Sequence, residues 1–148
     1  MASKVEEELR RLSLEIRFLE ETAQALQSRM NMVNAVITDL TYANMTLKGL
    51  GKNEIGSEIL VPVGGSSYIK AKLHDPDKVI VGIGAGVSVV KTSQEANEIV
   101  KKRLEDLEKT RVSLQQRFAQ VAQKINEDRA KFEELVAELR KGKPSRNV

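Results

Sequence analysis

The chain has 148 residues, of which 3% are aromatic and 30% are charged, and its formal net charge is +3. This aromatic content is low for a globular core but ordinary for long helices. The absence of cysteine excludes a disulfide scaffold and thiol catalysis and fits a reducing compartment, so we expect a cytoplasmic protein. Charged residues near the start argue against a signal peptide. No apolar run approaches the ~20 residues that span a bilayer, so we expect no membrane partner.

The positive charge is concentrated towards the C-terminus. Four basic residues lie there, namely Arg140, Lys141, Lys143 and Arg146, so the rest of the chain is close to neutral. Proteins that bind nucleic acid usually have a larger basic face, often with aromatic residues for stacking. We therefore expect no nucleic-acid partner and interpret residues 143–148 as a solvated basic tail. An RNA-binding adaptor is kept as the third alternative function.

The first 49 residues have the pattern of a coiled-coil helix. Ser3 followed by Glu6 is typical of a capping box at a helix start. Apolar residues then recur alternately three and four positions apart, at Leu9, Leu12, Ile16, Leu19, Ala23, Leu26, Met30, Val33, Ile37 and Leu40. This spacing keeps one apolar seam facing a partner helix. We expect Gly49 and Gly51 to close the helix in left-handed conformations.

The middle segment is residues 50–92. Within it, residues 58–91 change from a period of 3.5 to a period of 2, which indicates strands. Turn signals at Gly64-Gly65, Asp75-Pro76-Asp77 and the glycines at 84 and 86 separate four strands, so two β-hairpins are predicted. Short hairpins with apolar residues on both faces cannot bury themselves, so we expect an oligomer interface. Its expected residues are Ile59, Val61, Val63, Ile69, Leu73, Val79, Val81, Ile83, Val87 and Val89, with Leu60, Ile80 and Val90 on the opposite faces.

Residues 93–142 repeat the coiled-coil pattern. Thr92 with Glu95 marks the start, the helix ends near Gly142 and Pro144, and the seam contains Leu104, Leu107, Leu114, Phe118, Val121, Ile125, Phe132, Leu135 and Leu139. A helix–hairpins–helix chain most simply folds back on itself. The predicted fold is therefore α+β, a long antiparallel two-helix coiled coil with two β-hairpins at one end that oligomerise.

Polar residues also occupy seam positions, at Asn44, Arg111 and Asp128, and we expect them to fix the register of the two helices. Opposite charges flanking the seam give weaker support, because surface ion pairs contribute little. Glu15, for example, is placed to face Lys131 in the expected register.

No constellation of catalytic residues is present. The segment Gly82–Gly86 lacks the third glycine of a dinucleotide loop, because Val87 stands in its place, and a strand rather than a helix follows. His74, Asp75 and Asp77 form the one cluster that suggests a metal, but structural zinc needs more nitrogen or sulfur ligands. We expect no enzyme activity, no metal and no cofactor.

The hairpin sequences resemble a known family, the α-class subunits of prefoldin. Ile59–Leu73 (ILVPVGGSSYIKAKL) is similar to that family's first hairpin and Lys78–Val87 (KVIVGIGAGV) to its second. The resemblance implies a hexamer of two α and four prefoldin β subunits, assembled through a double β-barrel platform. It also implies that six projecting coiled coils grip unfolded client proteins at their tips and pass them to a group II chaperonin, without ATP.

The apolar residues near the free helix ends are the expected client-binding residues, namely Val5, Leu9, Leu12, Leu14, Phe18, Leu135, Val136 and Leu139. Leu14 and Phe18 lie off the seam, on the outer side of the helix, and are four residues apart, so they touch. Helix stabilisation or a subunit contact are open alternatives for this pair. For the whole chain, the alternative function is a coiled-coil scaffold or tether oligomerised through its β-region.

Overall fold

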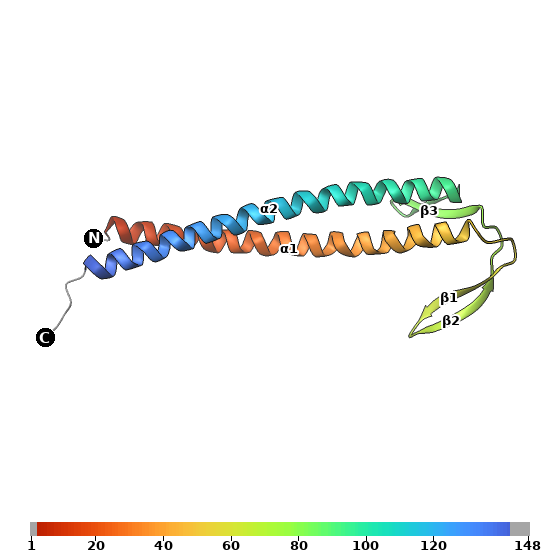
Figure 1. Ribbon diagram of the computed structural model, residues 1–148, viewed down its shortest axis with the longest axis horizontal. Coiled ribbons are helices and arrows are strands. Elements are labelled where there is room, and N and C mark those ends of the chain that lie inside the picture. Colours follow the sequence, from red (N-terminus) through yellow and green to blue (C-terminus); the bar gives the residue numbers. More distant parts are fainter. Residues whose placement is uncertain (1–2, 143–148) are drawn as a thin grey trace. The chain divides into compact units, whose positions relative to one another are not determined.

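The computed structural model describes residues 3–142 and consists of two long helices with two β-hairpins between them in sequence (Figure 1). The elements are α1 (Lys4–Leu50), β1 (Glu58–Gly64), β2 (Ser67–Lys72), β3 (Lys78–Gly84), β4 (Val87–Thr92) and α2 (Ser93–Gly142). This is the predicted α+β arrangement. The chain forms two compact units, one of Met1–Asn34 with Thr110–Val148 and the other of Ala35–Lys109. Pro144 and the basic tail at 143–148 lie outside the described residues.

Both predicted helix starts are confirmed by their caps. The backbone N–H of Glu6 donates to Ser3 Oγ at 3.2 Å, and the backbone N–H of Glu95 donates to Thr92 Oγ1 at 3.1 Å. Each bond satisfies one of the N–H groups that a helix start leaves without an intrahelical partner. Local sequence thus determines where α1 and α2 begin.

The predicted closure of α1 by left-handed glycines is wrong. The helix continues through Gly49 to Leu50, and neither Gly49 nor Gly51 has a positive φ. Instead, the N–H of Lys52 donates to Gly49 O at 3.2 Å and that of Asn53 to Leu50 O at 3.0 Å. These tighter bonds between residues three apart satisfy the last carbonyls, so no left-handed residue is needed there.

The four strands form two separate antiparallel hairpins, β1 with β2 and β3 with β4. Both turns have two-residue loops whose residues all have positive φ, at 57° and 59° in Gly65-Ser66 and at 50° and 73° in Ala85-Gly86. Such loops match the twist of the flanking strands. The first loop therefore lies one residue later than the predicted Gly64-Gly65.

The β3–β4 hairpin is anchored to the helices of its own unit. Val81 on β3 is buried in one cluster with Leu47 of α1 and with Ala96 and Val100 of α2. The guanidinium of Arg103 also donates from Nη2 to the carbonyl of Gly82 at 2.7 Å. Burying a valine side chain contributes roughly 1.5–3 kcal/mol, so this contact is a substantial part of the local stability.

The β1–β2 hairpin, in contrast, has little core of its own. Leu60 and Ile69 are 62% and 57% exposed. Leu73 was predicted to belong to its second strand, but β2 ends at Lys72. The backbone of Leu73 instead exchanges hydrogen bonds with Gly56 and Ser57, at 2.7 and 2.9 Å. An isolated two-stranded hairpin is only marginally stable in water. The apolar side chains of this one are exposed and therefore available for contact with other proteins.

The seam in the other unit is packed as the heptads predict. Leu26, Met30 and Leu114 form its buried cluster, with Val33, Phe118 and Val121 packed around them. The two helices are antiparallel here, and Glu20 Oε1 lies 2.6 Å from Arg129 Nη2 across the pair. Glu15 does not pair with Lys131 as expected but with Arg11 of its own helix, at 3.2 Å.

The described helices include none long and apolar enough to cross a membrane.

Candidate functional site at the helix ends and the hairpins

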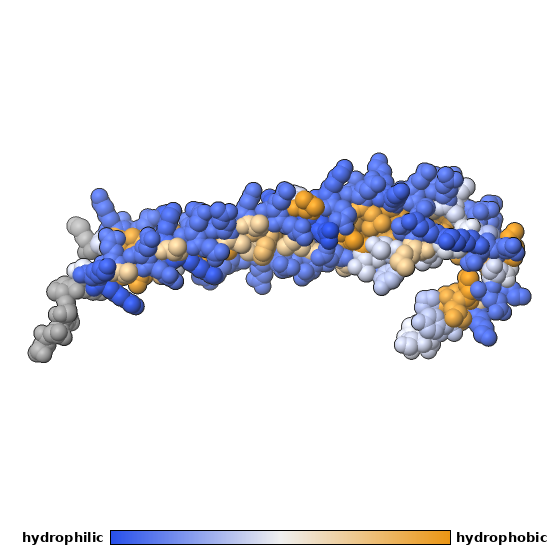
Figure 2. Space-filling view, viewed as in Figure 1, coloured by the Kyte–Doolittle hydropathy of each residue, from blue (hydrophilic) through white to orange (hydrophobic). Residues whose placement is uncertain are grey.

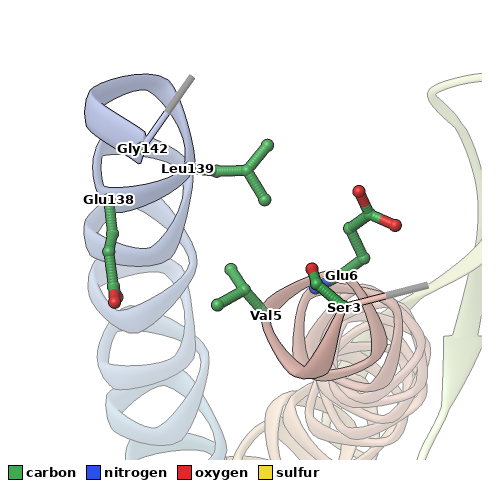
Figure 3. Close-up of a pocket in the computed structure, with 6 residues that line it drawn as sticks. All are labelled: Ser3, Val5, Glu6, Glu138, Leu139 and Gly142. Carbon is green, nitrogen blue, oxygen red and sulfur yellow. The ribbon is translucent and has the colours of Figure 1, made fainter. Parts of the chain in front are cut away.

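The paired ends of α1 and α2 enclose a hollow of ≈ 380 Å³ (Figure 3). Val5 of α1 and Leu139 of α2 both project into it, whereas Glu138 points along its own helix. The rest of the lining is Ser3, Glu6 and Gly142. Of the six lining residues only Val5 and Leu139 have apolar side chains, so the apolar contact that holds this end of the coiled coil is small and local opening is easy.

The eight residues expected at the tips fall into three classes of exposure. Leu12 is 1% exposed and therefore inaccessible while the helices are paired. Leu14 and Phe18 are 63% and 67% exposed on the outer side of α1, as their off-seam positions predict. The half-buried members are Val5, Leu9, Leu135, Val136 and Leu139. Only Leu14 and Phe18 thus present large apolar surfaces without any opening of the helix pair.

Charged residues close to this pair are partly held within α1. The Arg11 guanidinium hydrogen-bonds Glu8 and lowers the pKa of that carboxyl, and the same bond raises the pKa of Arg11. Arg11 also reaches Glu15. Arg11 thus offsets part of the negative charge of Glu8 and Glu15 along this side of α1.

The hairpin residues expected at an oligomer interface differ widely in exposure. Five of them are 41–57% exposed, namely Val61, Val63, Ile69, Ile83 and Val87. Ile59, Leu73, Val79 and Val89 are half-buried. Val81 is 7% exposed because the helices of its own chain cover it. Its role between subunits stays a prediction, but its apolar surface is already used within the chain.

The opposite hairpin faces are the more exposed ones, and sequence reasoning gave them too little weight. Leu60, Tyr68, Ile80 and Val90 are 60–75% exposed, and apolar surface is visible on the β1–β2 hairpin in Figure 2. Ile80 stands directly opposite Val90 in the register of β3 and β4. The sequence shows that Leu60, Ile80 and Val90 are apolar at positions between those chosen, but not that their face is the more exposed one.

A match to a known family covers the hairpins and most of both helices but stops short of most of the residues at the helix ends. The family model described as prefoldin subunit matches residues 19–138, which include both hairpins and most of both helices. The chain belongs to the prefoldin family. Its similarity is to alpha subunits: that of Methanopyrus kandleri is 38% identical over 115 residues, covering 78% of this chain and 73% of that protein. The alpha subunit of Methanococcoides burtonii is 33% identical over 125 residues, covering 84% and 91% respectively.

A solved prefoldin structure has the same fold. The cryo-electron-microscopy structure of filamentous PFD from Methanocaldococcus jannaschii matches with a TM-score of 0.65 and 28% identity, covering 85% of this chain and 98% of that one. Two long helices with two hairpins are therefore a prefoldin architecture, and the resemblance read from the hairpin sequences is confirmed. Membership of the family makes this chain a chaperone subunit.

The glycine-rich segment at 82–86 and the turn at 74–77, which resemble a dinucleotide loop and a metal site in sequence, have structural roles in this prefoldin subunit. Gly82–Gly86 forms the end of β3 and its turn, as predicted for a hairpin. Asp75 accepts the backbone N–H of Asp77 at 3.0 Å, and the N–H of Ser93 donates to Asp77 O at 3.0 Å, so this turn joins the hairpins to α2. Between residues 3 and 142, no three His, Cys, Asp or Glu side chains group closely enough to hold a metal ion.

Proposed function

We propose that this chain is the α-type subunit of an ATP-independent holdase, which binds non-native proteins at the distal helix ends and passes them to a group II chaperonin. In this proposal two such chains join four prefoldin β subunits in a cytoplasmic hexamer. One observation carries the proposal: Leu14 and Phe18 are 63% and 67% exposed on a helix whose seam residues are already packed against α2.

Capture at the tips would depend on several weak apolar contacts rather than one shaped pocket. A holdase must accept many sequences, and a distributed apolar surface does so at the cost of specificity. Covering an exposed Leu or Phe side chain contributes roughly 1.5–3 kcal/mol, so a few such contacts hold a client reversibly. Opening of the hollow between Val5 and Leu139 would add half-buried seam residues to this surface.

Assembly would use the hairpins. Each is a two-stranded sheet with two open edges, and such edges pair readily with strands of other chains. The exposed side chains of Leu60, Ile80 and Val90 lie on these strands, so pairing with hairpins of other subunits would bury them. A shared sheet of this kind would leave the distal helix ends free for clients.

The assembled complex, purified with its co-expressed partner subunit, tests the proposal directly. A chemically unfolded enzyme is diluted into buffer with and without the complex, and aggregation is followed by light scattering. We expect suppression at near-stoichiometric amounts and the same suppression with and without ATP. Unchanged aggregation would refute a holdase, and micromolar ATP binding in isothermal titration would refute nucleotide independence.

The second candidate is a coiled-coil scaffold oligomerised through its hairpins. The likeness to a filamentous PFD favours it, together with the open edges of both two-stranded sheets. An interface that does not close on itself extends into a filament. Electron microscopy of the chain without its partner subunit would reveal such filaments, and a scaffold would leave the scattering of the unfolded enzyme unchanged.

A further inference from the structure

The outer face of α1 carries a second heptad pattern, opposite the seam that contacts α2. Its apolar members are Leu14, Phe18, Ala25 and Met32. Together with Glu21 and Ser28 they form a series whose steps alternate between four and three residues. Leu14, Phe18 and Met32 are 63%, 67% and 70% exposed, and Ala25 is exposed as well. We call these four apolar residues the outer stripe.

The outer stripe is specific to α1. Among the described residues of α2, Val112 is the one exposed large apolar side chain, at 46%. Isolated exposed apolar residues are normal on any protein surface, but a series that repeats at helical spacing is the mark of a contact face. The asymmetry between the two helices therefore indicates a partner that lies against α1.

The spacing indicates that this partner is helical. Steps of four and three residues align with the turns of a second helix, whereas an extended strand would match side chains at intervals of two residues. The stripe spans 19 residues from Leu14 to Met32, or about 27 Å at a rise of 1.5 Å per residue. Small residues at 25 and 28 leave space between Phe18 and Met32 in which side chains of a facing helix fit.

Charge defines the partner further. Arg10 and Arg17 lie along one side of the stripe and Arg29 along the other, and none of the three forms an ion pair within residues 3–142. Arg11, by comparison, is held by Glu8 and Glu15. Against these three free cations stands, among the described residues, one free anion within the series, Glu21, so the balance favours a partner with acidic residues flanking its own apolar positions.

We propose that the outer stripe docks an amphipathic helix with acidic flanks, presented by the non-native client. The inference rests on the proposed holdase function and assigns its substrate class: partly folded chains that already contain helices. Client contact then extends from the tip along α1 as far as Met32, beyond the residues at the helix ends.

A labelled model peptide tests this docking. An 18-residue peptide carries Leu at heptad positions flanked by Glu, and its binding to the assembled complex is followed by fluorescence anisotropy. A peptide of the same composition in scrambled order should bind at least tenfold more weakly, and one with Lys in place of Glu likewise. Equal binding of the scrambled peptide would overturn the helical partner, and equal binding of the Lys peptide would overturn its acidic flanks.

The matched variants are Leu14→Ser with Phe18→Ser and Met32→Ser, against Val112→Ser on the outer side of α2. We expect at least a tenfold weaker peptide Kd for the triple variant and less than a twofold change for the control. Arg17→Glu with Arg29→Glu should reverse the preference between the Glu and Lys peptides. An unchanged Kd in the triple variant would overturn the proposal, as would loss of the assembled complex, which would assign the stripe to a subunit contact.

Light scattering on the same preparations separates this inference from the holdase function. If the wild-type complex suppresses aggregation and the triple variant does so equally well, clients do not dock on the outer stripe, and the proposed holdase function is unaffected. If the wild-type complex suppresses nothing, the holdase fails, and the client as occupant of the stripe fails with it. Reduced suppression in the triple variant alone supports the docking of clients on the stripe.

Discussion

Asp128 is the residue of this chain whose position conflicts most with simple burial of apolar groups. It occupies a seam position of α2, is 0% exposed, and neither carboxylate oxygen accepts a well-directed hydrogen bond. Lys124 Nζ lies 3.2 Å from Oδ1, and the pKa of Lys124 is raised by its bonding to Asp128 and by the charge of that carboxylate. A buried charge with one partially solvated partner costs stability but restricts the register in which helices pair.

Replacement of Asp128 by Leu should therefore stabilise the coiled coil. We expect the free energy of unfolding to rise by about 1–4 kcal/mol, because replacing the buried carboxylate with an apolar side chain removes its desolvation cost. Thermal unfolding followed by circular dichroism at 222 nm measures this change. Asp128→Asn is the control, since it removes the charge and keeps a polar group. A lower melting temperature for Asp128→Leu would show that the carboxylate is a net stabilising group.

Ala85 is a second residue held in an unfavourable state, with a φ of 50° in the turn between β3 and β4. A left-handed conformation costs an L-residue roughly 1–2 kcal/mol, and glycine adopts it freely. Ala85→Gly should slow hydrogen exchange of the β3 and β4 amides, and Ala85→Val should accelerate it because a branched side chain is strained there. Equal exchange in both variants would mean that turn strain does not limit the opening of this hairpin.

At the scale of elements, local patterns predicted much and tertiary contacts decided the rest. The heptads predicted both helices and their seams, and the caps at Ser3 and Thr92 were correct, because each depends on residues within a turn of one another. The choice of hairpin face was not available locally. Val81 and Ile80 are both apolar, and only packing against α1 and α2 makes the first 7% and the second 75% exposed.

The same limit applied to the register of the helices. The sequence placed Glu15 opposite Lys131, but Glu15 forms its ion pair with Arg11 of its own helix. An ion pair between the two helices is formed by Glu20 and Arg129. Surface ion pairs contribute well under about 1 kcal/mol each, so sequence alone cannot rank such alternatives. The end of α1 was mispredicted for a related reason, because tight backbone bonds can replace a left-handed glycine.

The exposed hairpin face gives a prediction about assembly. Ile80→Asp with Val90→Asp should abolish the complex and leave helical circular dichroism intact, because both side chains are solvated in the isolated chain. Val81→Asp should instead unfold its own unit, since an unpaired carboxylate buried among Leu47, Ala96 and Val100 costs several kcal/mol. Native mass spectrometry and circular dichroism separate the two effects. A complex that persists with both aspartates would place assembly on the other face.

At the scale of the whole molecule, each compact unit leaves a different apolar surface exposed among residues 3–142. In the unit of 35–109 it is the hairpins, and in the other unit it is the outer stripe with the tip hollow. Both α1 and α2 contribute residues to each unit. We infer that assembly and client capture are separable properties, because the residues proposed for each lie in different units.

Truncation of the arms tests that separation. Removing residues 1–19 together with 128–148 deletes Leu14, Phe18 and the tip hollow but keeps the buried cluster of Leu26, Met30 and Leu114, so the remaining helices should still pair. We expect an oligomer of unchanged stoichiometry in native mass spectrometry and at least a tenfold loss in the suppression of aggregation.

Removal of residues 143–148 alone is the control for this truncation, because this basic segment contains no leucine, isoleucine, methionine or aromatic residue. If the control loses suppression as fully as the long truncation, charge in the tail is the binding element and the tips are not. If the truncated complex still suppresses aggregation fully, clients are held by the hairpin unit. Dissociation of the truncated oligomer would instead show that the removed part of the seam also stabilises assembly. Assembly and client capture would then not be separable.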